Sequence, residues 1–244
     1  MDKEKINLET KRLPIKPLTR QELYHSTTDR LALINEEFKN GFEFLRKHPK
    51  SVTVFGGGHF TEKNSYYISA RSLGSKIANE LRYAVFTGGG PGIMEAANRG
   101  AFEVGGQSIG LTIELEKLQV ENPYLTSNIG FHYFFSRKVC LSFSAEAYVF
   151  FPGGYGTLNE FFEIITLVQT KKIERVPVIL FGSDFWNPIR EMMKKELLSR
   201  AAIDKDDLSL FKITDSESEV IKIIQNSPIR NGIKFTHPEV PAST

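Results

Sequence analysis

The sequence predicts an α/β protein built on a doubly wound parallel sheet. Short runs rich in Val, Ile and Phe lack polar alternation, which is typical of strands covered on both faces. Stretches with helical periodicity alternate with these runs, and such alternation favours right-handed crossovers between parallel strands. Glycine clusters end three of the runs, as expected where a strand turns sharply into a helix.

The N-terminal half is expected to contain a long helix and then three strands separated by two helices. An amphipathic helix of roughly 20 residues begins at Ser26 or Thr27 and ends near Pro49, because apolar residues recur at threes and fours. Runs of β-branched and aromatic residues predict strands over 52–55, 84–87 and 108–111. Helical spacing of apolar residues predicts helices over 66–81 and 91–102.

The C-terminal half continues the alternation after a loop that contains Asn122 and Pro123. A short apolar run near 131–134 leads into the next helix. The periodicity there predicts helices over 135–144, 157–170, 187–198 and 216–226. Apolar runs between them predict strands over 148–151, 176–181 and 211–213.

No linker interrupts residues 50–226, so we expect one Rossmann-like domain there with an N-terminal helical extension. The extension is an arm and helix over 1–49, and its first 18 residues are polar and contain two prolines. Residues 227–244 contain three prolines and are expected to form an irregular tail.

Composition excludes several classes of function for the 244-residue chain. Lys and Arg number 31 and Asp and Glu 29, and a net charge of +2 gives no reason to expect nucleic acid as a partner. The single cysteine, Cys140, excludes an internal disulfide and a multi-cysteine metal site. Neither His59 nor His132 has metal-ligand spacing. Without a membrane-length apolar run or a secretory signal, we expect a cytoplasmic protein with no membrane partner.

Three glycine clusters, Gly56–Gly58, Gly88–Gly92 and Gly153–Gly156, follow expected strands. Parallel sheets bind ligands beyond the carboxyl ends of their strands, and a helix N-terminus there suits phosphate. The alternative is that the glycines only make tight turns. Neither G-x-G-x-x-G after the first strand nor G-x-x-x-x-G-K-[ST] occurs, which disfavours NAD and ATP hydrolysis.

The third cluster belongs to the longer pattern P-G-G-x-G-T-x-x-E over residues 152–160. A chance match in a chain of this length is on the order of 10⁻⁵ from average residue usage. We expect Thr157 at the N-cap of a helix and Glu160 in its first turn, facing a bound phosphate ester. The alternative is a capping box, in which Glu160 only bonds back to Thr157.

These motifs resemble those of the LOG (Lonely Guy) family. That family carries a glycine-rich G-G-G-x-x-G-x-M segment, matched here over 88–94 with a spacing one residue tighter, and P-G-G-x-G-T-x-x-E, matched over 152–160. The segment 134–138 is similar to the part of the family that contains an Arg-Lys pair. The resemblance covers roughly residues 50–225.

The resemblance implies hydrolysis of the N-glycosidic bond of a nucleoside 5′-monophosphate, of the AMP or cytokinin nucleotide type, to free base and ribose 5-phosphate. It implies Arg137 and Glu160 as the catalytic pair, with no metal and no cofactor. A carboxylate suits the positive charge that develops on the ribose, and Arg offers a planar fork of donors. The implied substrate-binding residues are Gly57, Gly89, Gly90, Met94, Lys138, Gly153, Gly154, Gly156 and Thr157.

Other interpretations stay open at this point. Met94 is a core residue in the alternative view, and Arg137 a partner in an ion pair. His59 stands where relatives often have a basic residue after a serine, and Asn159 where many have a second acid. The chain is alternatively a non-catalytic nucleotide or molybdenum-cofactor carrier. The family is sometimes labelled lysine decarboxylase, but the sequence shows no recognisable arrangement of residues for binding pyridoxal phosphate. We also expect a homodimer or higher homo-oligomer that pairs through helices near the site.

Overall fold

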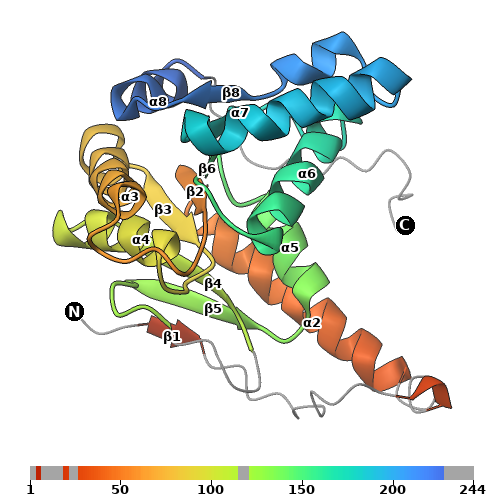
Figure 1. Cartoon of the computed structure of the whole chain (residues 1–244). Coiled ribbons are helices and arrows are strands. Elements are labelled where there is room, and N and C mark those ends of the chain that lie inside the picture. The colour runs from red at the N-terminus through yellow and green to blue at the C-terminus, as the bar shows by residue number, and fades with distance from the viewer. Residues whose placement is uncertain (1–3, 7–18, 22–26, 115–120, 228–244) are drawn as a thin grey trace.

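The computed structural model describes residues 4–6, 19–21, 27–114 and 121–227, and its centre is an eight-stranded sheet (Figure 1). The strand order is β1-β5-β4-β3-β2-β6-β7-β8, and every neighbouring pair is parallel. This arrangement confirms the predicted doubly wound α/β fold. The strands are β1 Glu4–Ile6, β2 Ser51–Phe55, β3 Ala84–Thr87, β4 Ser108–Ile113, β5 Ser127–Phe131, β6 Ala147–Phe150, β7 Val178–Phe181 and β8 Lys212–Thr214.

Helices cover both faces of the sheet, each over its own apolar core (Figure 1). Alternate strand residues point to opposite faces, so Phe55 joins one core and Val54 the other. Side chains of α2, α5, α6 and α7 line the first core, and those of α3, α4 and α8 line the second. The helices are α2 Thr27–Arg46, α3 Ser65–Lys76, α4 Ile93–Glu103, α5 Phe134–Ser142, α6 Tyr155–Gln169, α7 Ser183–Met192 and α8 Glu217–Gln225.

Helical turns of other kinds extend two of these helices and add one more. The predicted helix over 66–81 is an α-helix that continues as the π-helical turn Ile77–Leu81. After α7, a π-helical turn Met193–Leu197 and a 3₁₀ turn Leu198–Arg200 complete the predicted helix over 187–198. A further 3₁₀ turn, Lys205–Ser209, precedes β8.

Two strands were not predicted. Strand β5 begins with Ser127 and Asn128, which gave no apolar run, and its buried side chains include Ile129 and Phe131. Strand β1 lies within the segment expected to be an arm and pairs in register with β5. Only three residues long, β1 is too short to leave a periodic signal. The predicted irregular tail falls outside the described residues from 228 onward.

The first long helix packs on the sheet rather than apart from it. The core on its face of the sheet includes Phe44, which is 2% exposed, and Leu45. The N-terminal turns of α2 extend beyond the sheet (Figure 1). The expected boundaries at 49 and 227 stay predictions.

The chain changes direction across the sheet between β2 and β6. From β2 the strand order runs outward on one side through β3, β4 and β5, and on the other through β6, β7 and β8. The loops after β2 and β6 therefore leave adjacent strands toward opposite faces, which opens the crevice where such sheets bind ligands. The backbone N–H of Phe151 donates to Phe55 O (2.8 Å) and that of Gly57 to Pro152 O (2.9 Å), so these loops begin side by side.

Helix α6 is fixed by an aromatic cluster beneath it. The Phe161 ring is fully buried and lies 5.3 Å from the Trp186 ring and 5.7 Å from the Phe150 ring, centroid to centroid. The indole N–H of Trp186 donates to Phe150 O at 3.1 Å, which joins α7 to β6. These contacts hold the residue preceding Phe161, which is Glu160, at a fixed place above the sheet.

None of the helices within the described ranges combines the length and the apolar character that crossing a bilayer requires. The expected cytoplasmic location stays a prediction.

Candidate functional site

The three glycine clusters meet at the carboxyl edge of the sheet, with Gly57 between the other two. Its carbonyl accepts a hydrogen bond from Ile93 N (3.0 Å) at the start of α4, and its N–H donates to Pro152 O. A Cβ at Gly57 would lie 3.3 Å from the Gly153 Cα and 2.8 Å from the Phe60 ring. The Gly57 N–H is thus already bonded within the protein. Gly57 instead allows the loop after β2 to pack closely against the loop after β6.

Arg137 reaches this edge from the first turn of α5. Its Nε donates to Leu111 O on β4 at 2.8 Å, and the residue is half-buried. Burial lowers the pKa of the Arg137 guanidinium, and the negative charge of Glu160 opposes that shift. An arginine nevertheless stays charged at every physiological pH, so the site holds a fixed cation.

The Arg137 side chain occupies the space that a side chain at Gly88 would need. A Cβ at Gly88 would lie 2.3 Å from Arg137 Nη2 and 2.9 Å from Met94 Sδ. The predicted site residues Arg137 and Met94 therefore both lie against the loop after β3. Met94 is half-buried at the start of α4, close to the arginine.

Glu160 is a buried carboxyl group with an unsatisfied oxygen. It is 8% exposed, and its Oε2 has no hydrogen-bond partner among the described residues. Burial raises the pKa of the Glu160 carboxyl to about 7, although the charges of Lys138 and Arg137 lower it; Glu163 adds to the increase. The structure thus places the two predicted catalytic residues within electrostatic reach of each other.

Helix α6 begins earlier than predicted, which changes the roles of Thr157 and Glu160. The N-cap is Gly154 and the first helical residue is Tyr155, so the expected N-cap at Thr157 is wrong. Glu160 lies in the second turn rather than the first. The capping-box alternative for the pair is also wrong, because both residues lie inside the helix. Two glycines near the start of the motif gave no helical signal, which explains the misplaced boundary.

The glycines at the start of α6 differ in what they make room for. A Cβ at Gly153 would lie 2.1 Å from Thr157 Oγ1, so this glycine is required by the fold itself. At Gly154 and Gly156 a Cβ would have no neighbour within 4 Å, and both residues are exposed. The first N–H groups of a helix have no partner within the helix and carry its positive dipole end. Open space beside such amides suits a phosphate group.

Lys138 is engaged by an acidic neighbour. Its Nζ forms an ion pair with Glu163, which joins α5 to α6. Glu163 lies one helical turn from Glu160, and the charges of Lys138 and Glu163 act in opposite directions on the pKa of the Glu160 carboxyl. Direct contact of Lys138 with substrate stays a prediction.

A network of buried side chains, which no sequence pattern predicts, supports the loop over 88–90. Thr87 Oγ1 accepts from Gly89 N (2.9 Å) and donates to Asn98 Oδ1 (2.5 Å). The Asn122 amide donates to Asn98 Oδ1 (3.0 Å) and to Gly90 O (3.2 Å). The only signal for Asn98 was a polar residue within an otherwise apolar helix face.

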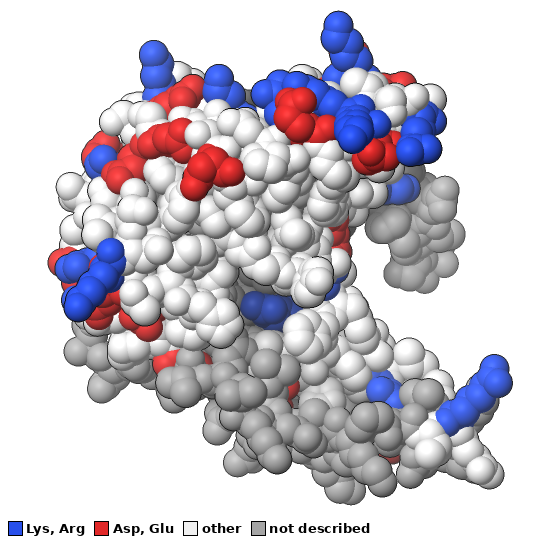
Figure 2. All heavy atoms as spheres, viewed as in Figure 1, with Lys and Arg blue, Asp and Glu red and all other residues white. Residues whose placement is uncertain are grey.

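The face that carries α5 is hollowed between α2 and the body of the molecule (Figure 2). Basic atoms lie at the floor of this hollow, and its walls are largely uncharged. Such a basic floor favours an anionic ligand.

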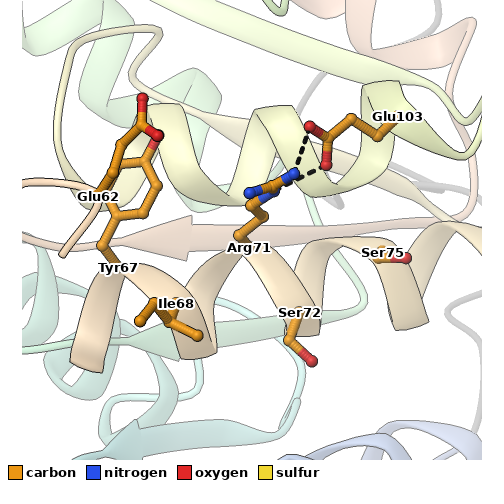
Figure 3. A pocket seen from close by; sticks show the side chains of 7 residues that line it. All are labelled: Glu62, Tyr67, Ile68, Arg71, Ser72, Ser75 and Glu103. Atoms are coloured by element: carbon orange, nitrogen blue, oxygen red, sulfur yellow. Dashed lines mark hydrogen bonds and ion pairs between the residues drawn. The ribbon is translucent and has the colours of Figure 1, made fainter. Parts of the chain in front are cut away.

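A second cavity lies away from the glycine loops, on the outer side of α3 and α4 (Figure 3). Its volume is about 270 Å³, and it is lined in part by Tyr67, Arg71 and Glu103. The Arg71 guanidinium donates to both carboxylate oxygens of Glu103, at 2.7 and 2.6 Å. The guanidinium of Arg71 is therefore already paired, and this ion pair holds α3 and α4 together.

The described ranges contain no group of three or more His, Cys, Asp or Glu side chains placed to hold a metal ion. Cys140 is buried against Gly41 of α2, and His59 is exposed.

Comparison with known proteins tests the resemblance. Residues 94–224, more than half of the chain, match the sequence profile of a family described as "Possible lysine decarboxylase". A cytokinin riboside 5′-monophosphate phosphoribohydrolase of Rhodococcoides fascians is 30% identical over 146 residues, which are 59% of this chain and 74% of that protein. The chain belongs to the LOG family. A probable LOG enzyme of the same name from Arabidopsis thaliana is 31% identical over 62% of this chain and 75% of its own length.

Solved structures similar to this LOG protein include two that handle the molybdenum cofactor. The molybdenum cofactor binding protein of Rippkaea orientalis is 24% identical, with a TM-score of 0.54 over 72% of this chain and 95% of that chain. The molybdenum cofactor carrier protein of Chlamydomonas reinhardtii is 23% identical, with a TM-score of 0.53 over 72% and 96%. At these identities the likeness shows the fold alone.

Burial of Glu160 is expected to cost stability at neutral pH. The carboxyl is protonated up to about pH 7 in the folded state, against an ordinary pKa of 4.5, so stability falls as the pH rises between these values. Glu160→Gln removes the charge and is expected to raise the free energy of unfolding at pH 8 by up to about 3 kcal/mol. The gain disappears near pH 4.5. Urea unfolding at both pH values, followed by Trp186 fluorescence, measures it.

The matched control is Glu174→Gln, a change at an exposed residue, which should leave the unfolding free energy unaltered at both pH values. An equal effect of Glu160→Gln at pH 4.5 and pH 8 would show that its carboxyl is not titrating near neutrality.

Proposed function

We propose that this LOG protein hydrolyses the N-glycosidic bond of a nucleoside 5′-monophosphate, giving free base and ribose 5-phosphate. The observation that carries the proposal is the buried Glu160 carboxyl beside Arg137, one turn beyond the open start of α6. One of its oxygens has no hydrogen-bond partner among the residues that the structure describes. A buried acid of raised pKa next to a cation in a ligand-binding crevice is typical of a catalytic group.

The amides at the start of α6 would hold the phosphate. Gly154 and Gly156 leave them open, and the helix dipole favours a dianion at that position. Thr157, packed on Gly153 within the first turn, would add a hydroxyl donor. The ribose would then extend toward Glu160.

In the reaction, water attacks the anomeric carbon while the bond to the base nitrogen breaks. The ribose develops positive charge, which the Glu160 carboxylate stabilises, and the same carboxylate accepts a proton from the attacking water. The base leaves with the electron pair of the broken bond and takes up a proton. Arg137 holds Glu160, the ribose or the phosphate through its planar fork of donors.

The names of the relatives support a cytokinin riboside 5′-monophosphate as the substrate, and AMP is the other nucleotide that the family resemblance implies. The chain departs from the motif of its relatives at His59 and Asn159. His59 is exposed after β2 and Asn159 is exposed on α6, so neither side chain takes the buried position that Glu160 occupies. A panel of monophosphates will decide the base.

A non-catalytic carrier of a nucleotide or of molybdenum cofactor is the second candidate, and it shares the fold. A carrier has no need of an unpaired buried acid, and the acid therefore favours the hydrolase. The family description also names lysine decarboxylase, but Lys138, the lysine beside the motif, is ion-paired with Glu163. An absorbance scan for bound pyridoxal phosphate tests that activity.

We further propose that two copies pair through the face that carries α5. Phe134 and Phe135 are 55% and 46% exposed at the start of this helix, and Leu31 of α2 is 53% exposed. The half-buried Phe38 of α2 has its ring centroid 6.4 Å from that of Phe135, so an aromatic contact joins α2 to the start of α5. Exposed aromatic side chains so close together are typical of an interface.

The wild-type protein is expected to release base from at least one of AMP, other purine and pyrimidine monophosphates, and cytokinin nucleotides. Glu160→Gln should lower kcat by at least about 100-fold. The value of kcat/KM should rise with pH up to about 7 and then level, because the ionised carboxyl is the active form. Release of base and ribose 5-phosphate, followed by chromatography, measures both. No turnover of any substrate, with nucleotide retained through purification, would favour the carrier.

Gly156→Ala separates a ligand role from a purely structural one. The methyl group meets no protein atom, so the free energy of unfolding should be unchanged or raised by up to about 1 kcal/mol. Binding of ribose 5-phosphate, measured by calorimetry, should weaken about tenfold or more because the methyl group occupies phosphate space. Gly153→Ala, by contrast, should destabilise the fold. Unaltered binding by Gly156→Ala would place the phosphate elsewhere.

Sedimentation at micromolar concentration is expected to show a dimer. Phe134→Glu should convert it to monomer, because a carboxylate would be buried unpaired in the interface. Phe102→Glu, at a 43% exposed phenylalanine of α4 on the other face of the sheet, is the control and should leave the dimer intact. A monomeric wild type would refute the pairing.

A further inference from the structure

Helix α2 lies outside the residues that match the family profile, yet it sends a buried carboxylate to the start of α5. Glu37 is 7% exposed, in contrast to Glu36 beside it, which faces solvent. The role of such a buried acid has to be found in its contacts.

Glu37 binds the N-terminal end of α5 through both of its oxygens. Its Oε1 accepts from His132 N at 2.5 Å, and its Oε2 accepts from Tyr133 N at 3.4 Å. The Ser136 hydroxyl donates to Oε2 as well. The N-cap residue of α5, Tyr133, makes no side-chain capping bond of its own.

A carboxylate from another helix thus does the work of a cap. The first N–H groups of a helix lack partners and carry its positive dipole end, so an anion there is stabilising. Hydrogen bonds to a charged acceptor are stronger than those between neutral groups. Glu37 thereby ties the beginning of α5 to α2.

Arg137 depends directly on where α5 begins. It is the fourth residue of the helix, and its N–H donates to Tyr133 O (3.2 Å), within the turn that Glu37 caps. Its guanidinium must fit between Leu111 O and Gly88, where a Cβ would already clash with it at 2.3 Å. A small displacement of the first turn would remove the guanidinium from this slot.

We propose that Glu37 is a positioning residue that fixes the first turn of α5 and so holds the Arg137 guanidinium against the loop after β3. The inference rests on the proposed function only for its effect on turnover. The same carboxylate occupies the N-terminal end of α5.

The experiment compares the full-length wild type with Glu37→Gln and Glu37→Ala, and with Glu36→Gln as the matched control. The first readout is the rate at which phenylglyoxal modifies Arg137, measured by peptide mass spectrometry on protein whose melting curve shows it to be folded. We expect Glu37→Ala to raise this rate at least fivefold, and Glu37→Gln, which keeps one acceptor oxygen, to raise it less. Glu36→Gln should leave it unchanged.

The second readout is steady-state turnover of a nucleotide that the wild type hydrolyses. A misplaced Arg137 should lower kcat about tenfold or more with KM changed less than twofold, in the order Glu37→Ala, then Glu37→Gln. Unaltered Arg137 reactivity in both folded variants would overturn the proposal, as would lowered melting temperature with full kcat. If the wild type itself hydrolyses nothing, the proposed function fails, and Arg137 reactivity alone decides the role of Glu37. Should Glu37→Ala not fold, Glu37→Gln decides.

Discussion

The site depends on the cost of keeping the Glu160 carboxyl out of water. No neighbour in the described part of the chain bonds to its buried Oε2, and two cations on α5 offset only part of the desolvation. Such an arrangement persists only where the surroundings are rigid enough to hold it. The aromatic cluster beneath α6 provides this rigidity, since the buried ring of Phe161 fixes the residue next to it. The doubly wound sheet, the glycine loops and α5 converge on this one group.

The sequence was sufficient for most of the fold because buried strands and amphipathic helices leave periodic signals. The P-G-G-x-G-T-x-x-E pattern likewise located Glu160, and the Arg-Lys pair within residues 134–138 located Arg137. What failed was local. Two glycines mask the start of α6, so the sequence predicts an N-cap at Thr157 where the structure has it at Gly154. Strand β5 begins with polar residues that mask its strand character.

The missing parts of the site share a physical reason. Glu37, Asn98 and Asn122 act through contacts between segments far apart in the chain, and no local periodicity encodes such contacts. Gly88 belonged to a recognised cluster, but its importance comes from the Arg137 side chain that packs on it. Sequence patterns therefore indicated the proposed catalytic groups, whereas the groups that hold them in place could be found only from the three-dimensional arrangement.

Strand β1 has a consequence for solubility. Without it, β5 would be the outermost strand on that side, and its unpaired N–H and C=O groups would form a template for intermolecular strand addition. The three-residue strand covers part of that border while presenting very little border of its own. Strand β1 is thus expected to reduce intermolecular strand pairing at the edge of the sheet, which is separated by several strands from the crevice between β2 and β6.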